Sequence, residues 1–423
     1  MEEKILVLSN NCFSKSNSNG RTLGNLFSNF PKENIAQFYV KYEKPEFSMC
    51  ENYYCTTDRQ ALKCFLGKKT YGHKVNEDEF SAQESGSLQA KPVKKTSFNR
   101  WLRSFIWKRY KWADATFWDF IDDFKPTMIL LQVGDDAFMC HLALKLKKKY
   151  NIPIVIYNSE SYYFKNFDYF SADNFLNKLF YPIFRCSYKR AFKKLMKNTS
   201  HCVYLCDKLK RDYDKLFNVP STVIYGSSEM SSTKSNNDKV KISYLGNLGL
   251  DRHTSLIEIA KCINSLSREL KLDVYGKASE NIIKEFNDCE GIDYKGFISY
   301  EQVKSVIENS DILIHTESFD KFYARDLEYA FTTKISDSLA SGKCFFVYAP
   351  KSFAFYEYLS ENQVAFVAST IDEMKAIFSD ILFNKESREK HRDAQLLLVE
   401  KNHRLDKNSD KFIQILLDCK KVV

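Results

Sequence analysis

The sequence predicts an α/β protein built from two units, each a parallel β-sheet wrapped by helices. Short apolar strands rich in β-branched residues alternate with helical segments along almost the whole chain. A turn-rich stretch without apolar periodicity, residues 226–238, interrupts this alternation. The chain of 423 residues is too long for one hydrophobic core, and its 44% hydrophobic residues suffice for two. We therefore expect two Rossmann-like domains, with a ligand at the C-terminal edges of the strands in the cleft between them.

The domain boundaries follow from the turn-rich stretch. Residues 1–226 are predicted as the N-terminal Rossmann-like domain, 227–238 as the linker and 239–395 as the C-terminal domain. Residues 396–423 are predicted as a helical tail that packs back on the N-terminal domain.

The elements expected in the first domain come from apolar runs and helical periodicity. They are strands at 4–9, 35–40, 127–133, 154–158, 202–206 and 222–225, and helices at 21–30, 98–123, 136–150, 173–197 and 207–217. Residues 68–97 are polar and irregular, which predicts a loop.

The second domain repeats the alternation. Its expected elements are strands at 240–245, 271–275, 292–297, 311–315, 344–348 and 364–367, helices at 254–266, 279–288, 300–309, 333–341 and 352–360, and a helical stretch from 371 to 423.

Composition excludes several classes of protein. No window approaches eighteen uninterrupted apolar residues, which excludes a transmembrane helix, and the acidic N-terminus is not a signal peptide, so we expect a cytoplasmic chain. A disulfide framework is not expected among the twelve cysteines, and Cys140, Cys202, Cys206 and Cys344, which sit in apolar runs, are expected to be reduced core residues. Cys50, Cys55, Cys64 and His73 have a spacing that matches no common zinc pattern, so no metal is expected.

One segment is both basic and aromatic. From Lys91 to Trp112 there are eight Lys or Arg residues and no acid, interleaved with three Trp. A helix over 98–112 of this kind suits peripheral contact with an anionic membrane, here the inner face of the plasma membrane. The alternative is an ordinary amphipathic helix whose Trp side chains pack on the core. Nucleic-acid binding is not expected, because the rest of the chain has no basic stripe or known motif.

A polar loop follows the first strand. Residues 9–22 carry small polar side chains, with Gly20 just before the expected helix. Free N–H groups at a helix N-terminus attract an anion, whereas a plain cap by Asn19 is the structural alternative.

Two segments of the second domain suggest a nucleotide diphosphate. Gly246 and Asn247 begin a turn after the first strand, and the turn carries Arg252, which suits a diphosphate. Further on, Thr332, Thr333 and Lys334 begin a helix whose free N–H groups could hold phosphate, and Asp337, one turn inside it, could hold a ribose diol.

These motifs together resemble a known family. GNLGLDRH, the series YKGF, SYEQV and SDILIHT, and TTKISDSLASGK resemble the donor half of a GT-B glycosyltransferase. The likeness is to the retaining family-4 type (glycosyl transferases group 1), in its bacterial surface-polysaccharide branch. SNSNGRTLGNLF and the segments 132–136 and 157–162 of the first domain are similar to the same branch.

The resemblance implies roles for individual residues of the second domain. Arg252 takes the place of the family's Lys on the donor phosphates, and Asn247 stands where an Arg is usual. Asp337 stands for the second Glu of the E-x7-E motif, which holds the nucleotide ribose, and Tyr329 occupies the position of the first Glu. Thr332, Thr333 and Lys334 match the family's phosphate-contacting turn, and Gly246 is expected to bind the donor from the turn after the first strand.

Three further positions complete the expected site. Gly20 corresponds to the loop that closes on donor phosphate and acceptor, and Glu160 lies near the family's sugar-facing His and is expected, with Arg252, to take part in catalysis. His315, at a strand end, is expected to contact the donor, whereas His141, His201 and His403 are not assigned a role.

The function implied is transfer of a sugar from a nucleotide-diphosphate sugar to a glycan or lipid-linked acceptor, with retention and without a metal cofactor. The reaction would belong to bacterial surface-polysaccharide synthesis, such as that of a capsule. Two alternatives stay open: a catalytically lapsed GT-B protein that binds a partner, and a nucleotide-sugar epimerase or hydrolase of the same fold.

Overall fold

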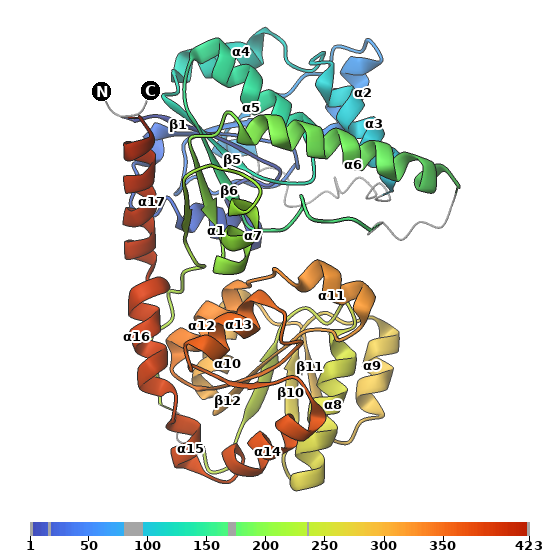
Figure 1. Ribbon diagram of the computed structural model, residues 1–423, viewed down its shortest axis with the longest axis vertical. Helices are drawn as coiled ribbons and strands as arrows, with labels where there is room; N and C mark the ends of the chain where they lie inside the picture. The colour runs from blue at the N-terminus through green and yellow to red at the C-terminus, as the bar shows by residue number, and fades with distance from the viewer. Residues whose placement is uncertain (1–2, 16–17, 80–95, 168–174, 235–236, 421–423) are drawn as a thin grey trace. The chain divides into compact units, whose positions relative to one another are not determined.

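The chain forms two compact units in a computed structural model that describes residues 3–15, 18–79, 96–167, 175–234 and 237–420 (Figure 1). Unit 1 comprises Met1–Ile224 and Asn408–Val423, and unit 2 comprises Tyr225–Lys407. The second unit thus takes in the stretch expected as a linker, as well as residues 396–407, which the sequence assigned to the tail.

Unit 1 is an eight-stranded sheet covered by helices. Its strands are β1 Ile5–Ser9, β2 Ile35–Tyr39, β3 Asn52–Cys55, β4 His73–Val75, β5 Met128–Gln132, β6 Ile154–Asn158, β7 His201–Tyr204 and β8 Ser221–Val223. Its helices are α1 Ser18–Asn25, α2 Asp58–Phe65, α3 Ser97–Lys108, α4 Ala115–Phe124, α5 Ala137–Tyr150, α6 Phe175–Met196 and α7 Asp207–Asp214, with 3-10 turns at Lys32–Asn34 and Glu77–Glu79. The strand order is β4-β3-β2-β1-β5-β6-β7-β8.

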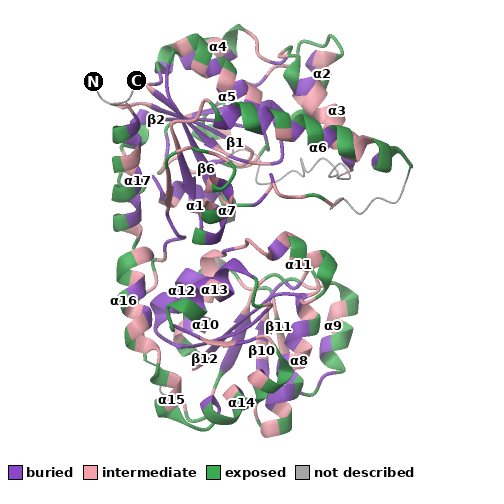
Figure 2. Ribbon diagram, in the orientation of Figure 1, coloured by how far each residue is buried: buried purple, intermediate pink, exposed green. Residues whose placement is uncertain are grey.

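The sheet of unit 1 is parallel apart from one edge strand. β4 pairs antiparallel with β3, within the region that the sequence predicted as a loop, and residues 80–95 of that loop lie outside the described residues. The central strand β1 is buried along its whole length, which is why it reads as a continuous apolar run (Figure 2). The core also takes in α17, Leu405–Lys420, whose Phe412 ring lies 5.2 Å from that of Phe27.

The single helix predicted over 98–123 is wrong. The chain forms α3 and α4 instead, and Tyr110 between them has a left-handed backbone with φ 54. Asp114 then begins α4 by accepting a hydrogen bond from the Phe117 N–H. The aromatic pattern over residues 98–123 is unbroken, so it did not indicate the turn at Tyr110. β3 and α2, in the stretch 41–67, were not expected either.

Unit 2 is a six-stranded sheet whose neighbouring strands are all parallel. Its strands are β9 Ile242–Leu245, β10 Leu272–Tyr275, β11 Ile292–Gly296, β12 Ile312–Thr316, β13 Cys344–Tyr348 and β14 Phe366–Ala368. Its helices are α8 Arg252–Leu266, α9 Glu280–Asn287, α10 Tyr300–Asn309, α11 Lys321–Leu327, α12 Thr333–Ser341, α13 Ala354–Glu361, α14 Ile371–Ile381, α15 Lys385–Glu389 and α16 Arg392–Asn402.

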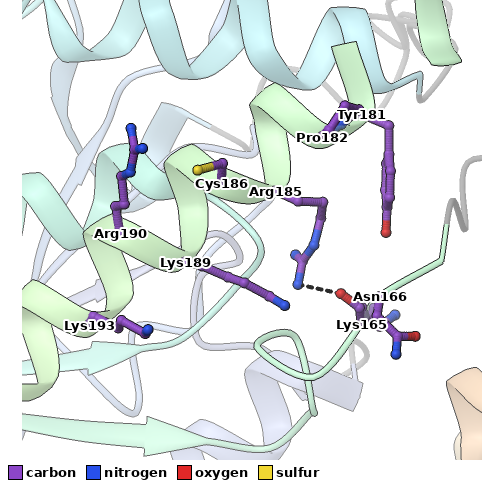
Figure 3. Close-up of a pocket in the computed structure, with 9 residues that line it drawn as sticks. All are labelled: Lys165, Asn166, Tyr181, Pro182, Arg185, Cys186, Lys189, Arg190 and Lys193. Carbon is purple, nitrogen blue, oxygen red and sulfur yellow. Dashed lines mark hydrogen bonds between the residues drawn. The ribbon is translucent and has the colours of Figure 1, made fainter. Parts of the chain in front are cut away.

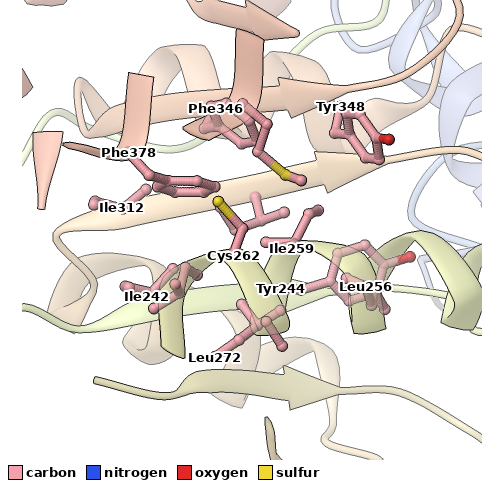
Figure 4. Close-up of a cluster of buried hydrophobic side chains, with 14 of the residues drawn as sticks. Ile242, Tyr244, Leu256, Ile259, Cys262, Leu272, Ile312, Phe346, Tyr348 and Phe378 are labelled. Atoms are coloured by element: carbon pink, nitrogen blue, oxygen red, sulfur yellow. The ribbon is translucent and has the colours of Figure 1, made fainter. Parts of the chain in front are cut away.

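The strand order of unit 2 is β11-β10-β9-β12-β13-β14, the doubly wound order of a Rossmann sheet. Apolar side chains of α8, the central strands and α14 close its core, as Figure 4 shows for Ile242, Ile259, Ile312 and Phe378. Helix α11 was not expected from the sequence. Among the described residues, none of the helices combines the length and the apolar character that a bilayer span requires.

Candidate functional site

The strand order of unit 2 places two polar segments next to each other. The order reverses between β9 and β12, which are hydrogen-bonded neighbours, so the chain leaves their C-terminal ends in opposite directions. Ligands of doubly wound sheets bind at such a switch point. The turn 246–251 follows β9, and Glu317 follows β12.

Arg252 and Glu317 meet at this edge in a buried ion pair. Arg252 Nε lies 2.5 Å from Glu317 Oε2, and Nη2 lies 3.0 Å from Oε1. The remaining terminal nitrogen of Arg252 donates to the Gly249 carbonyl at 3.2 Å. The first residue of α8 is thus tied to the end of β12. Burial raises the pKa of the Glu317 carboxyl, and the Arg252 guanidinium acts against that rise.

The turn between β9 and α8 has an unusual backbone. Leu250 and Asp251 both adopt left-handed conformations, with φ 60 and φ 61. The Asn247 side-chain Oδ1 accepts a hydrogen bond from the Gly249 N–H at 2.9 Å, and the Asn247 backbone carbonyl accepts one from the Tyr244 hydroxyl at 2.9 Å. The Asn247 side chain, which stands where the family has an Arg, therefore holds the turn together.

Lys334 reaches this turn from the first turn of α12. A β-carbon at Gly246 would meet Lys334 Nζ and would come within 2.7 Å of the Tyr244 hydroxyl, so glycine lets both side chains approach this turn. Lys334 Nζ lies 5.8 Å from the centre of the Tyr244 ring. Burial lowers the pKa of Lys334 to about 8, and the positive charge of Arg252 contributes. No carboxylate of the described residues lies within ion-pair distance of Lys334. Within the described part of the chain, the site therefore holds a cation without a directly paired carboxylate.

His315 is buried near the end of β12. Its Nε2 has no hydrogen-bond partner among the described residues, and its ring packs edge-on against Phe355 with centroids 4.8 Å apart. Burial holds the pKa of His315 well below its usual range, and the charges of Lys334 and Arg252 add to this effect. His315 is accordingly a neutral imidazole beside two cations.

The start of α12 offers further polar groups. Thr332 is the N-cap residue, but its side chain makes no capping bond, and its Oγ1 is buried without a partner in the described part of the chain. The Asp337 carboxylate accepts a hydrogen bond from Ser228 Oγ at 2.6 Å. Ser228 lies in the stretch that the sequence predicted as a linker. That stretch therefore belongs to unit 2, and it contacts Asp337, the residue expected to hold the ribose.

The structure thus brings Gly246, Arg252, His315 and Lys334 to one edge of the unit 2 sheet. Glu317, which belongs with them, was not predicted. Local sequence patterns do not indicate Glu317, because its position beside Arg252 follows from the pairing of β9 with β12.

Gly20 and Glu160, the two site residues predicted in unit 1, lie on different segments of that unit. Gly20 lies within the first turn of α1, which begins at Ser18 and not after Gly20 as expected. A β-carbon at Gly20 would come within 2.8 Å of the Ser14 nitrogen, so glycine lets the preceding loop pack on the helix. Glu160 is exposed on the segment after β6.

The basic aromatic segment serves mainly the core of unit 1. Trp107 and Trp112 are each 1% exposed. Arg100 and Arg103 pair with Asp136 at the start of α5, and Arg103 also pairs with Asp58 at 2.7 Å. The amphipathic-helix alternative therefore accounts for much of this segment, and Lys91, Lys94 and Lys95 lie outside the described residues.

His141, His201 and His403, to which the sequence assigned no role, are half-buried or buried within the fold. His201 Nε2 lies 2.9 Å from Thr222 Oγ1, and buried His403 contacts the Gly226 carbonyl and the Tyr358 hydroxyl. His141 is half-buried on α5, where burial lowers its pKa to about 4.

All cysteines are unpaired, and eleven of the twelve are buried. No cluster of three or more metal-ligating side chains occurs in the described ranges.

Comparison with known proteins shows the fold and a partial family similarity. The family model described as "Glycosyl transferase-like" matches residues 252–414. Sucrose-phosphate synthase from Thermosynechococcus elongatus superposes with a TM-score of 0.63 at 9% identity, covering 100% of both chains. The Anabaena protein HepE in complex with UDP gives a TM-score of 0.62 at 9% identity, covering 98% of this chain and 100% of that one.

A third similar structure is a mutant of S. aureus TarM in complex with fondaparinux, α-GlcNAc-glycerol and UDP. It has a TM-score of 0.55 at 11% identity and covers 99% of this chain and 100% of that one. No curated protein shows a significant sequence match to the chain. The expected α/β fold of two Rossmann-like units is thereby confirmed: the chain has the fold of the GT-B glycosyltransferases, and its residues 252–414 are similar to the glycosyl transferase-like family model.

Proposed function

We propose that this chain transfers a sugar from a nucleotide-diphosphate sugar to a glycan or lipid-linked acceptor, and that unit 2 binds the nucleotide. The observation that carries this proposal is the position of Lys334. Its ammonium group lies against Gly246 at the switch point of the sheet, has no paired carboxylate among the described residues, and sits in the first turn of α12. A diphosphate fits this place because it supplies the missing negative charge.

The surrounding residues suggest how the leaving group is stabilised. Lys334 and the positive N-terminal end of the α12 dipole would neutralise the diphosphate as the bond to the sugar breaks. Arg252, oriented by Glu317, would contribute a second cation. Asp337 would accept hydrogen bonds from the ribose hydroxyls, and His315 would contact the donor as a neutral group. We propose that this charge balance needs no metal ion.

The finer features of the reaction are proposed from resemblance. They are retention at the sugar carbon, participation of Glu160 and Gly20, and a role in surface-polysaccharide synthesis. HepE and TarM were solved with UDP, and TarM also with α-GlcNAc-glycerol, which makes uridine diphosphate the first nucleotide to test and a sugar-bearing acceptor a reasonable substrate class.

The test is calorimetric titration of UDP, GDP, CDP and ADP into the whole chain, with EDTA present. We expect one nucleotide to bind, and Lys334→Met to weaken that binding at least about tenfold through loss of a charge-assisted hydrogen bond. Lys304→Met is the matched control, since Lys304 is an exposed lysine of α10. Binding by none of the four nucleotides, or equal losses in both variants, would overturn the proposal.

A second function is favoured by the Arg252–Glu317 pair. Because Arg252 already has a buried counterion, a nucleotide-binding protein without transferase activity is the alternative. Release of the nucleoside diphosphate from the corresponding nucleotide sugar, measured with and without acceptor glycans, separates the two. Tight nucleotide binding with no release in any mixture would favour the lapsed protein.

Peripheral membrane contact is also a proposal, and α6 suits it better than residues 98–112. Phe175, Leu176, Leu179 and Ile183 are 78%, 53%, 48% and 45% exposed and recur at helical spacing. The same helix carries exposed Arg190 and lysines toward its end. Apolar side chains beside cations are the pattern that binds an anionic bilayer surface.

A further inference from the structure

A cavity lined by cations lies along α6 in unit 1. It has a volume of about 520 Å³, and five of its nine lining residues are cations: Lys165, Arg185, Lys189, Arg190 and Lys193 (Figure 3). None of the nine is acidic. Lys165 and Asn166 lie on the segment that follows β6, and the other lining residues lie on α6.

Arg185 is the buried centre of this cavity. Its side chain extends from α6 toward Lys165 and Asn166 (Figure 3), and the residue is 5% exposed. One terminal nitrogen, Nη2, donates to the carbonyls of Tyr162 and Lys165, both at 2.7 Å. These bonds hold the guanidinium in place. Its Nε and Nη1 have no hydrogen-bond partner among the described residues.

The two buried Arg185 nitrogens that have no partner among the described residues, Nε and Nη1, need an acceptor. Leaving such N–H groups unpaired costs more free energy than an ordinary hydrogen bond contributes. Lys189 adds to the demand for negative charge, because burial and the charges of Arg185 and Lys193 lower its pKa. Several cations around a planar set of donors suit a multiply charged anion with several oxygens, and a phosphate ester meets that description better than a single carboxylate.

We propose that this cavity binds the phosphate group of a phosphate ester, with Arg185 Nε and Nη1 as fixed donors and Lys189, Arg190 and Lys193 as counter-charges. The binding itself is independent of the nucleotide site. That the ester is part of the sugar acceptor rests on the proposed function.

Cys186 provides a reporter for this site. It lines the cavity and is exposed, whereas the other eleven cysteines are buried. The rate of its alkylation by iodoacetamide, followed by mass spectrometry of the whole chain, therefore reports whether the cavity is occupied. The probes are inorganic phosphate, glycerol 3-phosphate and vesicles of phosphatidylcholine with or without phosphatidic acid. Glycerol, and acetate at equal ionic strength, are the controls.

We expect a phosphate probe at ten times its Kd to slow alkylation about tenfold, with no effect from glycerol or acetate. The Lys189→Gln/Lys193→Gln double variant should lose this protection, while Lys148→Gln, at an exposed position of α5, should keep it. Protection by glycerol 3-phosphate supports a soluble phosphate ester. Protection only by vesicles containing phosphatidic acid supports a lipid phosphate.

Three results would overturn the proposal: no protection by any phosphate probe, equal protection by acetate, or protection that survives in the double variant. UDP titration of the same variants separates this site from the nucleotide site. Protection of Cys186 in a chain that binds no nucleotide would leave the cavity assignment standing and remove the proposed function alone.

Discussion

The Arg252 guanidinium and the Glu317 carboxylate form a two-point ion pair across 65 residues of sequence. The pair joins the helix after the first strand of unit 2 to the end of the fourth strand. Because both side chains are nearly buried, each depends on the other for its charge to be tolerated. The ion pair therefore couples the stability of unit 2 to the position of Arg252, which is proposed to contact the donor phosphates.

Glu317→Gln should destabilise unit 2 and make it more dependent on ligand. Removing one partner of a buried pair costs about 3–5 kcal/mol, because the Arg252 charge is left uncompensated. A bound nucleoside diphosphate would replace that counterion. We expect a lower melting temperature and a larger upward shift with UDP than in the parent chain.

The matched control is Glu269→Gln, at an exposed ion pair with Lys239 that should contribute little. A Glu317→Gln chain that loses stability but gains no extra stabilisation from UDP would show that the diphosphate does not approach Arg252.

Nucleotide binding should weaken as the pH rises through about 8. Burial lowers the pKa of Lys334 to about 8, so the group is mostly charged at pH 7 and mostly neutral at pH 9. A bound diphosphate favours the charged form, and the affinity should therefore fall about tenfold between these two pH values. Calorimetric titration of UDP at intervals from pH 6.5 to 9.5 measures this dependence.

Lys334→Arg tests the assignment of that pH effect. Arginine stays charged over the whole range, so its binding curve should be flat between pH 7 and 9. If the variant kept the slope of the parent chain, another group would be responsible for the titration.

Asp337→Asn separates ribose recognition from phosphate recognition. Asparagine has one acceptor oxygen and no charge where the carboxylate has two acceptor oxygens, so it holds a diol less well and UDP affinity should fall about tenfold. Pyrophosphate lacks the ribose, and its affinity should be unchanged. Ser228→Ala, which removes only the neighbouring donor to Asp337, is the companion variant. Equal losses for UDP and pyrophosphate would instead indicate that Asp337 supports the shape of α12.

Sequence patterns predicted those parts of the fold that depend on local signals. The bounds of α12 were predicted correctly, because an N-terminal Thr and the left-handed Gly342 enclose an apolar periodic segment. The break at Tyr110 and the edge strand β4 depend on tertiary packing and give no such signal. Local patterns likewise predicted Arg252 and Lys334 but not Glu317, whose importance arises only from the pairing of β9 with β12.

Membrane binding, if it involves α6, should depend on its exposed apolar row. We expect Leu179→Ser/Ile183→Ser to weaken co-sedimentation with anionic vesicles at least about tenfold, since each side chain contributes about 1.5–3 kcal/mol when buried. Leu216→Ser is the control, because Leu216 is an equally exposed apolar residue of unit 1. Trp107 cannot serve in this test: its replacement by Ala would cost about 3–5 kcal/mol of core packing and confound lost binding with unfolding. Unchanged sedimentation of the double variant would remove α6 from the proposal.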